Sequence, residues 1–244
     1  GSILLHCDWR LNSQIRIIMG EVFGNQQYKT EIIWKRTAAG KTVSKNLPQN
    51  TDSILWFTKS NNFIFNGFFG KLSKENKKVF SKDDKDGRGL YRTQPLIKPS
   101  NPGPLTTYDY TDNMGRVWKC PKTGWRRNQN KMKELENDNR LLFTSVISEK
   151  YYLKEREEIG RQLSNLWDDI PGNTIKFSSE NTDYPTQKPE KMLDRIIRSL
   201  SNKGDIVCDF FSGSGTTAAV SEKLNRKWIC SDLGKFAIHT TRKR

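Results

Sequence analysis

The chain has 244 residues, of which 34% are hydrophobic and 28% are charged, so it is long enough to bury a sizeable core beneath a polar surface. Its formal net charge of +15 favours a polyanionic partner, most simply nucleic acid. No apolar run approaches the roughly 18 residues that a membrane span needs, and no signal peptide is evident, so these patterns count against a membrane protein.

The cysteines and histidines predict neither a metal site nor a disulfide framework. The four cysteines are Cys7, Cys120, Cys208 and Cys230, and no two of them have C-x-x-C spacing. With only two histidines in the chain, a zinc site is not expected. Free thiols in apolar runs are typical of a reducing compartment, which predicts a cytoplasmic protein.

The first part of the chain predicts a strand, a helix and two further strands. Residues 2–8 (SILLHCD) form a short apolar run, and apolar residues then recur at helical spacing until Gly24, which can end a helix. The β-branched and aromatic runs KTEIIWKR and DSILWFTKS predict two more strands. Residues 1–65 are therefore expected to form one half of an α/β core.

Residues 66–164 have a different character. The stretch KLSKENKKVFSKDDKDGRGLYR is densely charged, and residues 98–128 carry Pro, Gly and aromatic residues without a clear period. We expect an irregular insertion here, with one helix near residues 129–136.

Regular patterns return in residues 165–244. The run KPEKMLDRIIRSLSN has Pro189 in its first turn and a single apolar face, which predicts a helix. A buried strand (DIVCDFF), a helix (TTAAVSEKLNR) and another strand (KWICSDL) are expected next, and a last helix begins in KFAIHTTRKR.

The turn after DIVCDFF is typical of a nucleotide-cofactor site. Gly213 and Gly215 let the backbone turn sharply and approach a ligand, and Ala218 completes the spacing G-x-G-x-x-A. Asp232 ends the next strand, 17 residues past Gly215, where a carboxylate can accept hydrogen bonds from both ribose hydroxyls of an adenosine. A glycine-rich turn without a ligand, and Asp232 as a helix cap, remain the alternatives.

The position of this turn implies an unusual strand order. Only 12 residues follow Asp232, too few for further β-α-β units. The remaining strands must come from the N-terminal part, so the sheet is expected to be permuted.

Six segments then carry a family resemblance: GSILLHCDW, FGNQQYKTEIIWKR, ILWFTK, YPTQKPEKML, DFFSGSGTT and WICSDL, in this order. They resemble the permuted β-class of DNA amino-methyltransferases, which modify adenine N6 or cytosine N4 with S-adenosylmethionine. The segments GWRRN, YYLKE and LWDDI resemble markers around the target-recognition region of relatives in restriction-modification systems. The resemblance implies an α/β fold with a Rossmann-like methyltransferase sheet, circularly permuted and incomplete. It divides the chain into core residues 1–65, a target-recognition insertion over 66–164 and a cofactor-binding half over 165–244.

The resemblance also implies the roles of individual residues. Thr186, Gln187, Lys188 and Pro189 are expected to shape the pocket for the methionine end of the cofactor, with a helix-capping turn as the alternative. Asp209 is expected to hold cofactor amino or backbone groups, and Asp232 to bind the ribose. The wall beside the adenosine is expected to consist of Phe211, Gly213 and Gly215, and the neighbouring Ser212, Ser214 and Thr216 are also expected to bind the cofactor.

The family's catalytic motif, [D/N/S]-P-P-[Y/F/W], is not found, because the sequence contains no Pro-Pro pair. In the permuted order this motif precedes the strand of residues 2–8, so it is expected to lie before Gly1. We therefore expect a fragment without catalytic residues that is inactive alone, and a degenerate enzyme is the alternative. The expected activity of the intact enzyme is methylation of adenine N6 after base flipping. Cytosine-N4 methylation and non-catalytic DNA binding remain open.

The insertion is expected to contact double-stranded DNA. Its candidate phosphate ligands are Lys71, Lys74, Lys77, Lys78, Lys82, Arg88 and Arg92, interleaved with Tyr91, Tyr108, Tyr110 and Trp118. A solvated charged face is the alternative, since acidic residues dilute the run. A restriction subunit is a further expected partner, and the sequence does not predict an oligomeric state.

Overall fold

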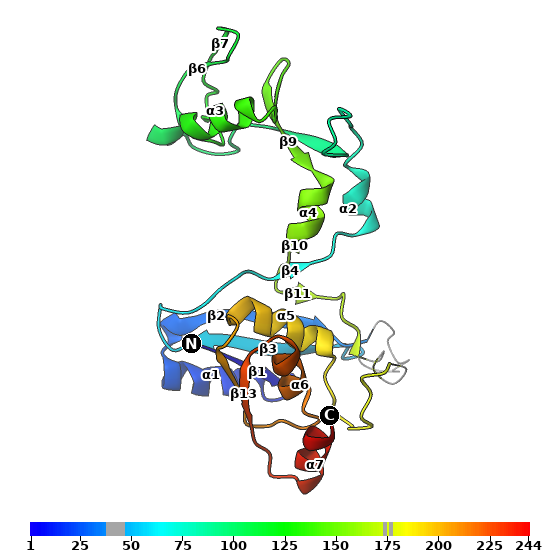
Figure 1. Cartoon of the computed structure of the whole chain (residues 1–244). Helices are drawn as coiled ribbons and strands as arrows, with labels where there is room; N and C mark the ends of the chain where they lie inside the picture. Colours follow the sequence, from blue (N-terminus) through cyan, green and yellow to red (C-terminus); the bar gives the residue numbers. More distant parts are fainter. Residues whose placement is uncertain (38–46, 173–174, 176–177) are drawn as a thin grey trace. The chain divides into compact units, whose positions relative to one another are not determined.

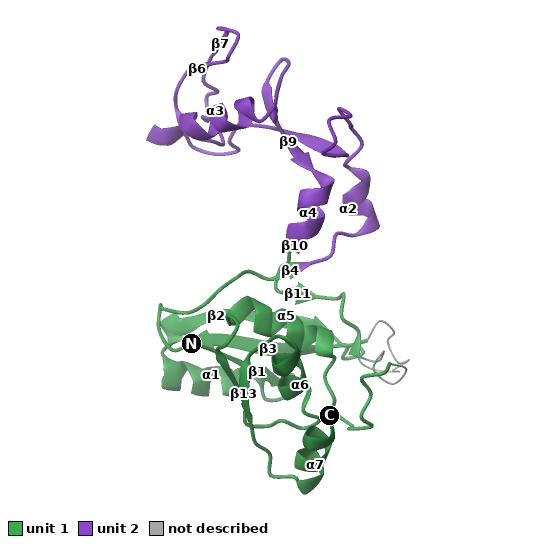
Figure 2. Cartoon of the chain, in the orientation of Figure 1, with its two compact units in different colours: residues 1–69, 162–244 green, residues 70–161 purple. Residues whose placement is uncertain are grey.

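The computed structural model describes residues 1–37, 47–172, 175 and 178–244. The chain divides into two compact units, residues 1–69 with 162–244 and residues 70–161 (Figure 2). The sequence-based boundaries lie nearby, after residues 65 and 164. Two short strands, β4 (Phe69–Gly70) and β10 (Arg161–Gln162), lie where the chain passes between the units.

The first unit contains a four-stranded sheet in the order β1-β3-β2-β11. Its strands are β1 (Ser2–Cys7), β3 (Thr51–Thr58), β2 (Tyr28–Lys35) and β11 (Leu166–Trp167). β3 is antiparallel to both β1 and β2, so the carboxyl ends of β1 and β2 meet at one edge of the sheet. β11 pairs with β2 in parallel and brings the chain back after the insertion.

A helix covers each face of this sheet. Along β3 the alternation of strand side chains sends Ile54 and Trp56 to one face and Leu55 and Phe57 to the other. The apolar side of α5 (Glu190–Leu200) packs on the first face, and α1 (Asn12–Phe23) packs on the second (Figure 1). The predictions of both helices are thereby confirmed. The single turn η1 (Asn25–Gln27) joins α1 to β2.

The C-terminal part of this unit contains β12 (Ile206–Asp209), α6 (Thr216–Lys223), β13 (Lys227–Cys230) and α7 (Lys235–Lys243). β12 and β13 pair in parallel as a separate two-stranded sheet. Because α6 connects them, they form one β-α-β unit, as the sequence predicts. Val207 packs with α5 and α6 on one face of this small sheet.

The expectation that DIVCDFF is a buried strand is wrong for its other face. Ile206 is 60% exposed and Cys208 is also exposed, and Phe210, the next residue of the same parity just after the strand, is 65% exposed. Among the described residues β12 and β13 pair only with each other, so neither outer edge of this parallel pair meets another strand, and the face that carries Ile206 and Cys208 is exposed. A parallel sheet is normally covered on both faces, which is why the apolar run suggested burial.

The second unit is more regular than the irregular insertion that the sequence predicts. It contains a three-stranded antiparallel sheet in the order β5-β9-β8, with β5 (Tyr91–Pro95), β9 (Ile147–Tyr152) and β8 (Leu141–Phe143). Its other elements are α2 (Lys74–Lys78), η2 (Pro104–Thr106), the hairpin β6 (Tyr110–Thr111) and β7 (Val117–Trp118), α3 (Gln129–Asn137) and α4 (Leu153–Ile159). The helix expected near residues 129–136 is present as α3.

This unit has a core of its own, formed by Leu96, Tyr110, Trp125, Met132, Leu135, Leu141 and Ile147. These residues are spread over α3, short strands and loops, so together they give no single period in the sequence, which is why the sequence predicts irregular chain here. Within the described residues, no helix of either unit is long and apolar enough to cross a bilayer.

Candidate functional site

The turn between β12 and α6 has the backbone that its glycines predict. Gly213 and Gly215 have φ values of +50° and +73°, in the left-handed region that glycine tolerates best. Asp232 fastens the turn, because its Oδ2 accepts a hydrogen bond from the Gly213 N–H at 2.9 Å. Its Oδ1 accepts a hydrogen bond from the Gly234 N–H at 2.9 Å. The backbone hydrogen bonds from Gly234 and then Gly213 lower the pKa of Asp232, so the carboxylate is ionised at neutral pH.

Asp209 anchors the other side of the turn. Its Oδ1 accepts a hydrogen bond from the Phe211 N–H at 3.0 Å, and its Oδ2 accepts one from the Thr217 hydroxyl at 2.6 Å. The carboxylate therefore joins the end of β12 to the first turn of α6. Phe211, between these two anchors, projects an almost fully exposed ring.

The small polar residues of the turn are buried and bonded to one another. The hydroxyl groups of Ser214 and Thr216 lie 3.0 Å apart, and the Thr216 hydroxyl donates to the Lys188 carbonyl at 3.1 Å. Ser212 lies 3.3 Å from the Thr241 hydroxyl. The structure thus brings the segment of residues 186–189 against the glycine turn, as the predicted cofactor site requires.

Gln187 holds its own loop together. Its Oε1 accepts hydrogen bonds from the N–H and the hydroxyl of Thr182, and its Nε2 donates to the Glu180 carbonyl at 2.6 Å. Glu180 in turn accepts a hydrogen bond from the Glu190 N–H at the start of α5. The Gln187 side-chain amide and the Glu190 N–H at the start of α5 therefore already have hydrogen-bond partners within the chain, although this segment was expected to shape the cofactor pocket. Pro189 is buried at the helix N-cap and Thr186 is exposed.

Lys188 lies beside a charged cluster at the carboxyl edge of the larger sheet. There Asp52 is 3.1 Å from the His6 Nε2 and 3.1 Å from the Arg36 Nε. Burial lowers the pKa of Lys188, Asp52 opposes the shift, and Arg36 adds to it. The Lys188 ammonium donates to the Thr186 carbonyl at 2.9 Å, so it stabilises the turn that precedes α5.

The last helix, α7, lies over the glycine turn. The Phe236 ring stacks on the Tyr184 ring at a centroid distance of 5.5 Å and an angle of 9°. A Cβ atom on Gly213 would lie 3.3 Å from Tyr184, and a Cβ atom on Gly215 would lie 2.8 Å from the Thr241 Cα. Close approach as well as φ therefore requires a glycine at position 215, whereas at position 213 the requirement comes mainly from φ.

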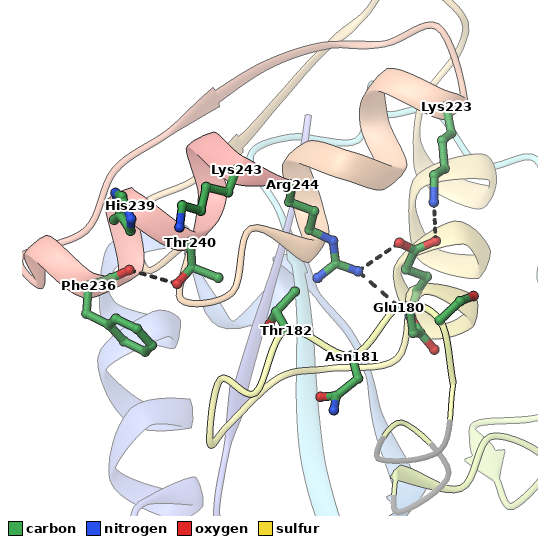
Figure 3. A pocket seen from close by; sticks show the side chains of 11 residues that line it. Glu180, Asn181, Thr182, Lys223, Phe236, His239, Thr240, Lys243 and Arg244 are labelled. Carbon is green, nitrogen blue, oxygen red and sulfur yellow. Dashed lines mark hydrogen bonds and ion pairs between the residues drawn. The ribbon is translucent and has the colours of Figure 1, made fainter.

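A polar hollow of about 580 Å³ lies between α7 and the start of α5 (Figure 3). Arg244 reaches across it to within 2.7 Å of the Glu190 Oε1, and Lys223 lies 2.6 Å from the Glu190 Oε2. The Arg244 guanidinium also donates to Thr216 at 3.1 Å. These contacts fix α7 against the glycine turn, and most of the charges that line the hollow are paired.

Comparisons with known proteins agree with this geometry. Residues 1–243 match the N6/N4 methyltransferase family, described as DNA methylase. The chain belongs to this family. The matched range includes both compact units and the glycine turn between β12 and α6.

The relatives are restriction-modification proteins. The chain is 27% identical over 255 residues to the type II methyltransferase M.EcaI of Enterobacter cloacae, covering 100% of this chain and 53% of that protein. It is 26% identical over 243 residues to the StyLTI Mod subunit of Salmonella typhimurium, described as a type III restriction-modification enzyme. That match covers 93% of this chain and 36% of the Mod subunit. The chain thus spans about half, or less, of the length of these relatives.

A solved structure shares the fold. It is titled as the crystal structure of an M1.HpyAVI–SAM complex, and it matches with a TM-score of 0.51 at 19% sequence identity. The match covers 100% of this chain and 73% of that chain. The fold of this DNA methylase chain is therefore that of a methyltransferase, with mixed α/β elements in open sheets.

In this methylase chain the insertion residues expected to contact DNA fall into two groups. Lys77 pairs with Glu157, and Arg88 lies 2.8 Å from Asp86. Tyr91 and Tyr110 are buried, so the aromatic residues that the sequence interleaves with lysines belong to packing rather than to an exposed surface. The remaining basic residues are Lys71, Lys74, Lys78, Lys82 and Arg92, and no ion pair joins them to a described carboxylate.

Sequence reasoning overlooked several residues that shape the site. Tyr184, Glu180 and Arg244 contact the turn or its supporting loop, but none was assigned a role. Arg244 meets Glu190 from 54 positions away, and a contact of that range leaves no local pattern. Tyr184 could have been found from the sequence, because it begins YPTQKP, part of a segment that carries the family resemblance. Trp56 and Phe57 of β3 pack on the two faces of the sheet.

Proposed function

We propose that this chain is the cofactor-binding and DNA-recognising part of a cytoplasmic DNA methyltransferase of the restriction-modification type. The cofactor is S-adenosylmethionine, and the target is the N6 amine of adenine in duplex DNA. The observation that carries the proposal is the glycine turn of β12 and α6, fastened by Asp232 and backed by the segment of residues 186–189.

The hydrogen-bonding capacity of Asp232 fits an adenosine. Each carboxylate oxygen has about two lone-pair sites. Gly213 and Gly234 each donate a backbone N–H to a different oxygen, and a weaker backbone hydrogen bond from Leu233 also lowers the pKa of Asp232. The carboxylate therefore keeps acceptor capacity for a ribose hydroxyl group beside the bonds that fasten the turn. Since hydrogen bonds lower the pKa of Asp232, the carboxylate stays charged and accepts strongly at neutral pH.

The other proposed contacts divide into direct and supporting ones. Phe211 offers an exposed ring beside the turn on which an adenine can pack. We also assign the backbone of residues 212–216 and the exposed Thr186 to the cofactor contacts, because Thr216 of the turn bonds to the Lys188 carbonyl two residues after Thr186. Gln187 and Asp209 shape the site indirectly, because their polar atoms hold the loop and the turn.

When bound, S-adenosylmethionine supplies an electrophilic methyl group for the amine. The chain's own residues hold the adenosine and orient it, which is the positional part of catalysis. The polar acceptor and the stacking aromatic residue of a [D/N/S]-P-P-[Y/F/W] motif are not among the 244 residues. We therefore propose that this chain alone binds the cofactor but transfers no methyl group.

Titration calorimetry of the purified chain with S-adenosylmethionine tests the first half of this proposal. Binding is expected at a single site, with competition from S-adenosylhomocysteine. The absence of heat in the presence of either compound, with a folded chain by circular dichroism, would refute the cofactor assignment.

The activity is tested with tritiated cofactor and duplex DNA. The 244-residue chain is expected to incorporate label only at background, whereas the same chain preceded by a family segment containing the catalytic motif is expected to methylate DNA. Nucleoside mass spectrometry of that product distinguishes N6-methyladenine from N4-methylcytosine. Label incorporated by the chain alone would contradict the proposed division of roles.

A restriction subunit is the proposed protein partner. The support is the similarity to the Mod subunit of a type III restriction-modification enzyme. Co-purification of the full-length protein with the product of a neighbouring restriction gene is the corresponding measurement.

A further inference from the structure

The hairpin of the second unit ends in an exposed tip. Its strands, Tyr110–Thr111 and Val117–Trp118, are joined by the five residues 112–116, DNMGR. Met114 at the tip is 81% exposed, and Gly115 has a φ of +82°. A turn of this kind needs a glycine but no large apolar side chain, so the exposed methionine has no role in the fold.

Asp112 holds the tip rigid from inside. Its carboxylate accepts hydrogen bonds from the N–H groups of Met114 and Arg116, both at 2.9 Å. It also accepts from the Arg116 Nε at 2.8 Å and from the Trp118 Nε1 at 3.0 Å. Burial alone would raise the pKa of Asp112, but the hydrogen bonds from Trp118, Arg116 and Met114 outweigh it and lower the pKa to about 2.

Helix α3 supports the hairpin from below. The Asn113 N–H donates to the Glu136 Oε1 at 2.7 Å, and the Asn113 side chain donates to Asn137 at 3.1 Å. Glu136 also accepts a hydrogen bond from the buried Tyr110 hydroxyl at 2.6 Å. The tip is thus tied at its base and along its length, so little conformational entropy remains to be lost on binding.

The Arg116 guanidinium is held at its Nε end, and its terminal nitrogens are free of hydrogen bonds within the described residues. Its Nε is bonded to Asp112, and its plane lies over the rings of Trp118 and Phe143 at 5.6 and 5.7 Å. Its two terminal nitrogens form no hydrogen bond with the part of the chain that the structure describes. A fork that is fixed at its base and has free terminal N–H groups is prepared for a planar acceptor pair.

The charge of the surrounding unit fits DNA. Residues 70–161 contain 21 Lys and Arg against 13 Asp and Glu, a net formal charge of +8. A basic unit attracts the phosphate backbone without regard to sequence, and base edges must be read by a few placed side chains. In the major groove an arginine fork matches the O6 and N7 acceptors of guanine, and an apolar side chain can contact a thymine methyl group.

We propose that the hairpin of residues 110–118 reads a groove of duplex DNA, with Arg116 directed to a base edge and Met114 in apolar contact beside it. This inference rests on the proposed function, and it assigns sequence recognition to two residues. The phosphate contacts of the basic unit then supply affinity, while the hairpin supplies discrimination.

The test selects DNA sequences with the 244-residue chain. Wild type, Arg116→Lys, Met114→Ala and the control Leu105→Ala are each used to select from a random duplex library by mobility shift and sequencing. Leu105 is a suitable control because it is also a large exposed side chain of the same unit, at 75% exposure. Fluorescence anisotropy with one selected duplex and one random duplex, at several salt concentrations, gives affinities and salt slopes.

Arg116→Lys is expected to keep the salt slope and the affinity for random DNA, because the charge is conserved, but to lose roughly tenfold or more in preference at one base pair. Met114→Ala is expected to weaken binding to the selected duplex only, and Leu105→Ala to resemble wild type. Selection of the same motif by all four proteins would refute the proposal, as would wild-type selection of no motif. Neither of these two results would bear on the proposed cofactor site, because S-adenosylmethionine binding is measured separately by calorimetry.

Discussion

Substitution of Gly215 by alanine tests the glycine turn, and Gly204 provides a matched control. Both glycines have positive φ values, +73° for Gly215 and +86° for Gly204. A Cβ atom on Gly204 would meet nothing within 4 Å, whereas one on Gly215 would lie 2.8 Å from the Thr241 Cα. The pair therefore separates the cost of backbone conformation from the cost of displacing α7.

The expected magnitudes follow from this geometry. A left-handed conformation costs an alanine about 1–2 kcal/mol, and the loss of glycine's freedom in the unfolded chain returns about 0.4–1 kcal/mol. Gly204→Ala is therefore expected to destabilise its unit by about 1 kcal/mol. Gly215→Ala must also push Thr241 away, because ordinary contacts begin at 3.4 Å, and overpacking of this kind adds about 1–3 kcal/mol.

The assay is hydrogen exchange by mass spectrometry, combined with calorimetry of S-adenosylmethionine binding. Exchange resolved by peptide suits a chain with two units, since a single unfolding transition cannot be assumed. Gly215→Ala is expected to speed exchange in α6 and α7 and to weaken cofactor binding, whereas Gly204→Ala leaves the affinity unchanged. Equal exchange and equal affinity in the two variants would refute the reasoning that α7 lies against the turn.

Three further substitutions test the site and its support. Asp232→Asn is expected to weaken S-adenosylmethionine binding by roughly tenfold or more, measured by calorimetry, because a charged acceptor of the ribose is lost; unchanged affinity would remove Asp232 from the site. Burial lowers the pKa of Lys188, so the unfolded chain binds this proton more tightly, and wild-type stability should rise relative to Lys188→Met as the pH increases toward 10.5 in urea titrations. A pH-independent difference between these two proteins would contradict that sign. Arg195 donates to Asp169 at 2.9 Å and is itself buried, so Arg195→Ala is expected to cost about 1–3 kcal/mol. The exposed Arg198 of the same helix is the control, with an expected cost of at most about 0.5 kcal/mol, and similar urea midpoints for both variants would contradict this reading.

Local patterns were sufficient for much of the candidate site. The glycine spacing predicted a sharp turn, which the structure forms with positive φ at both glycines, and the apolar spacing within KPEKMLDRIIRSLSN predicted the helix α5. These features depend on neighbours within a few residues, for which backbone sterics and periodicity are reliable guides. The assignment of Asp232 to the turn also needed only the β-α-β connection, which places the ends of adjacent parallel strands together.

The partners of the polar groups were not predictable in the same way. Gln187 binds Thr182 and Glu180 instead of facing outward, and Glu180 already occupies the start of α5. A side-chain amide carries both donors and acceptors, so the sequence cannot tell which of several nearby groups will satisfy it. The same ambiguity hid the role of Asp112, which looks like any acidic residue in a charged insertion.

By itself the sequence predicted the α/β fold class, most of the order of helices and strands in residues 1–65 and 165–244, and the glycine turn after β12, because these follow from short-range spacing and from chain connectivity. Only the tertiary structure decided which faces are covered. DIVCDFF has the composition of a buried strand, yet one of its faces is exposed, since burial depends on which other strands and helices pack against it. The tertiary structure also decided that Tyr91 and Tyr110 belong to a core while Met114 and Arg116 lie at an exposed tip, a distinction made by contacts between segments far apart in the chain.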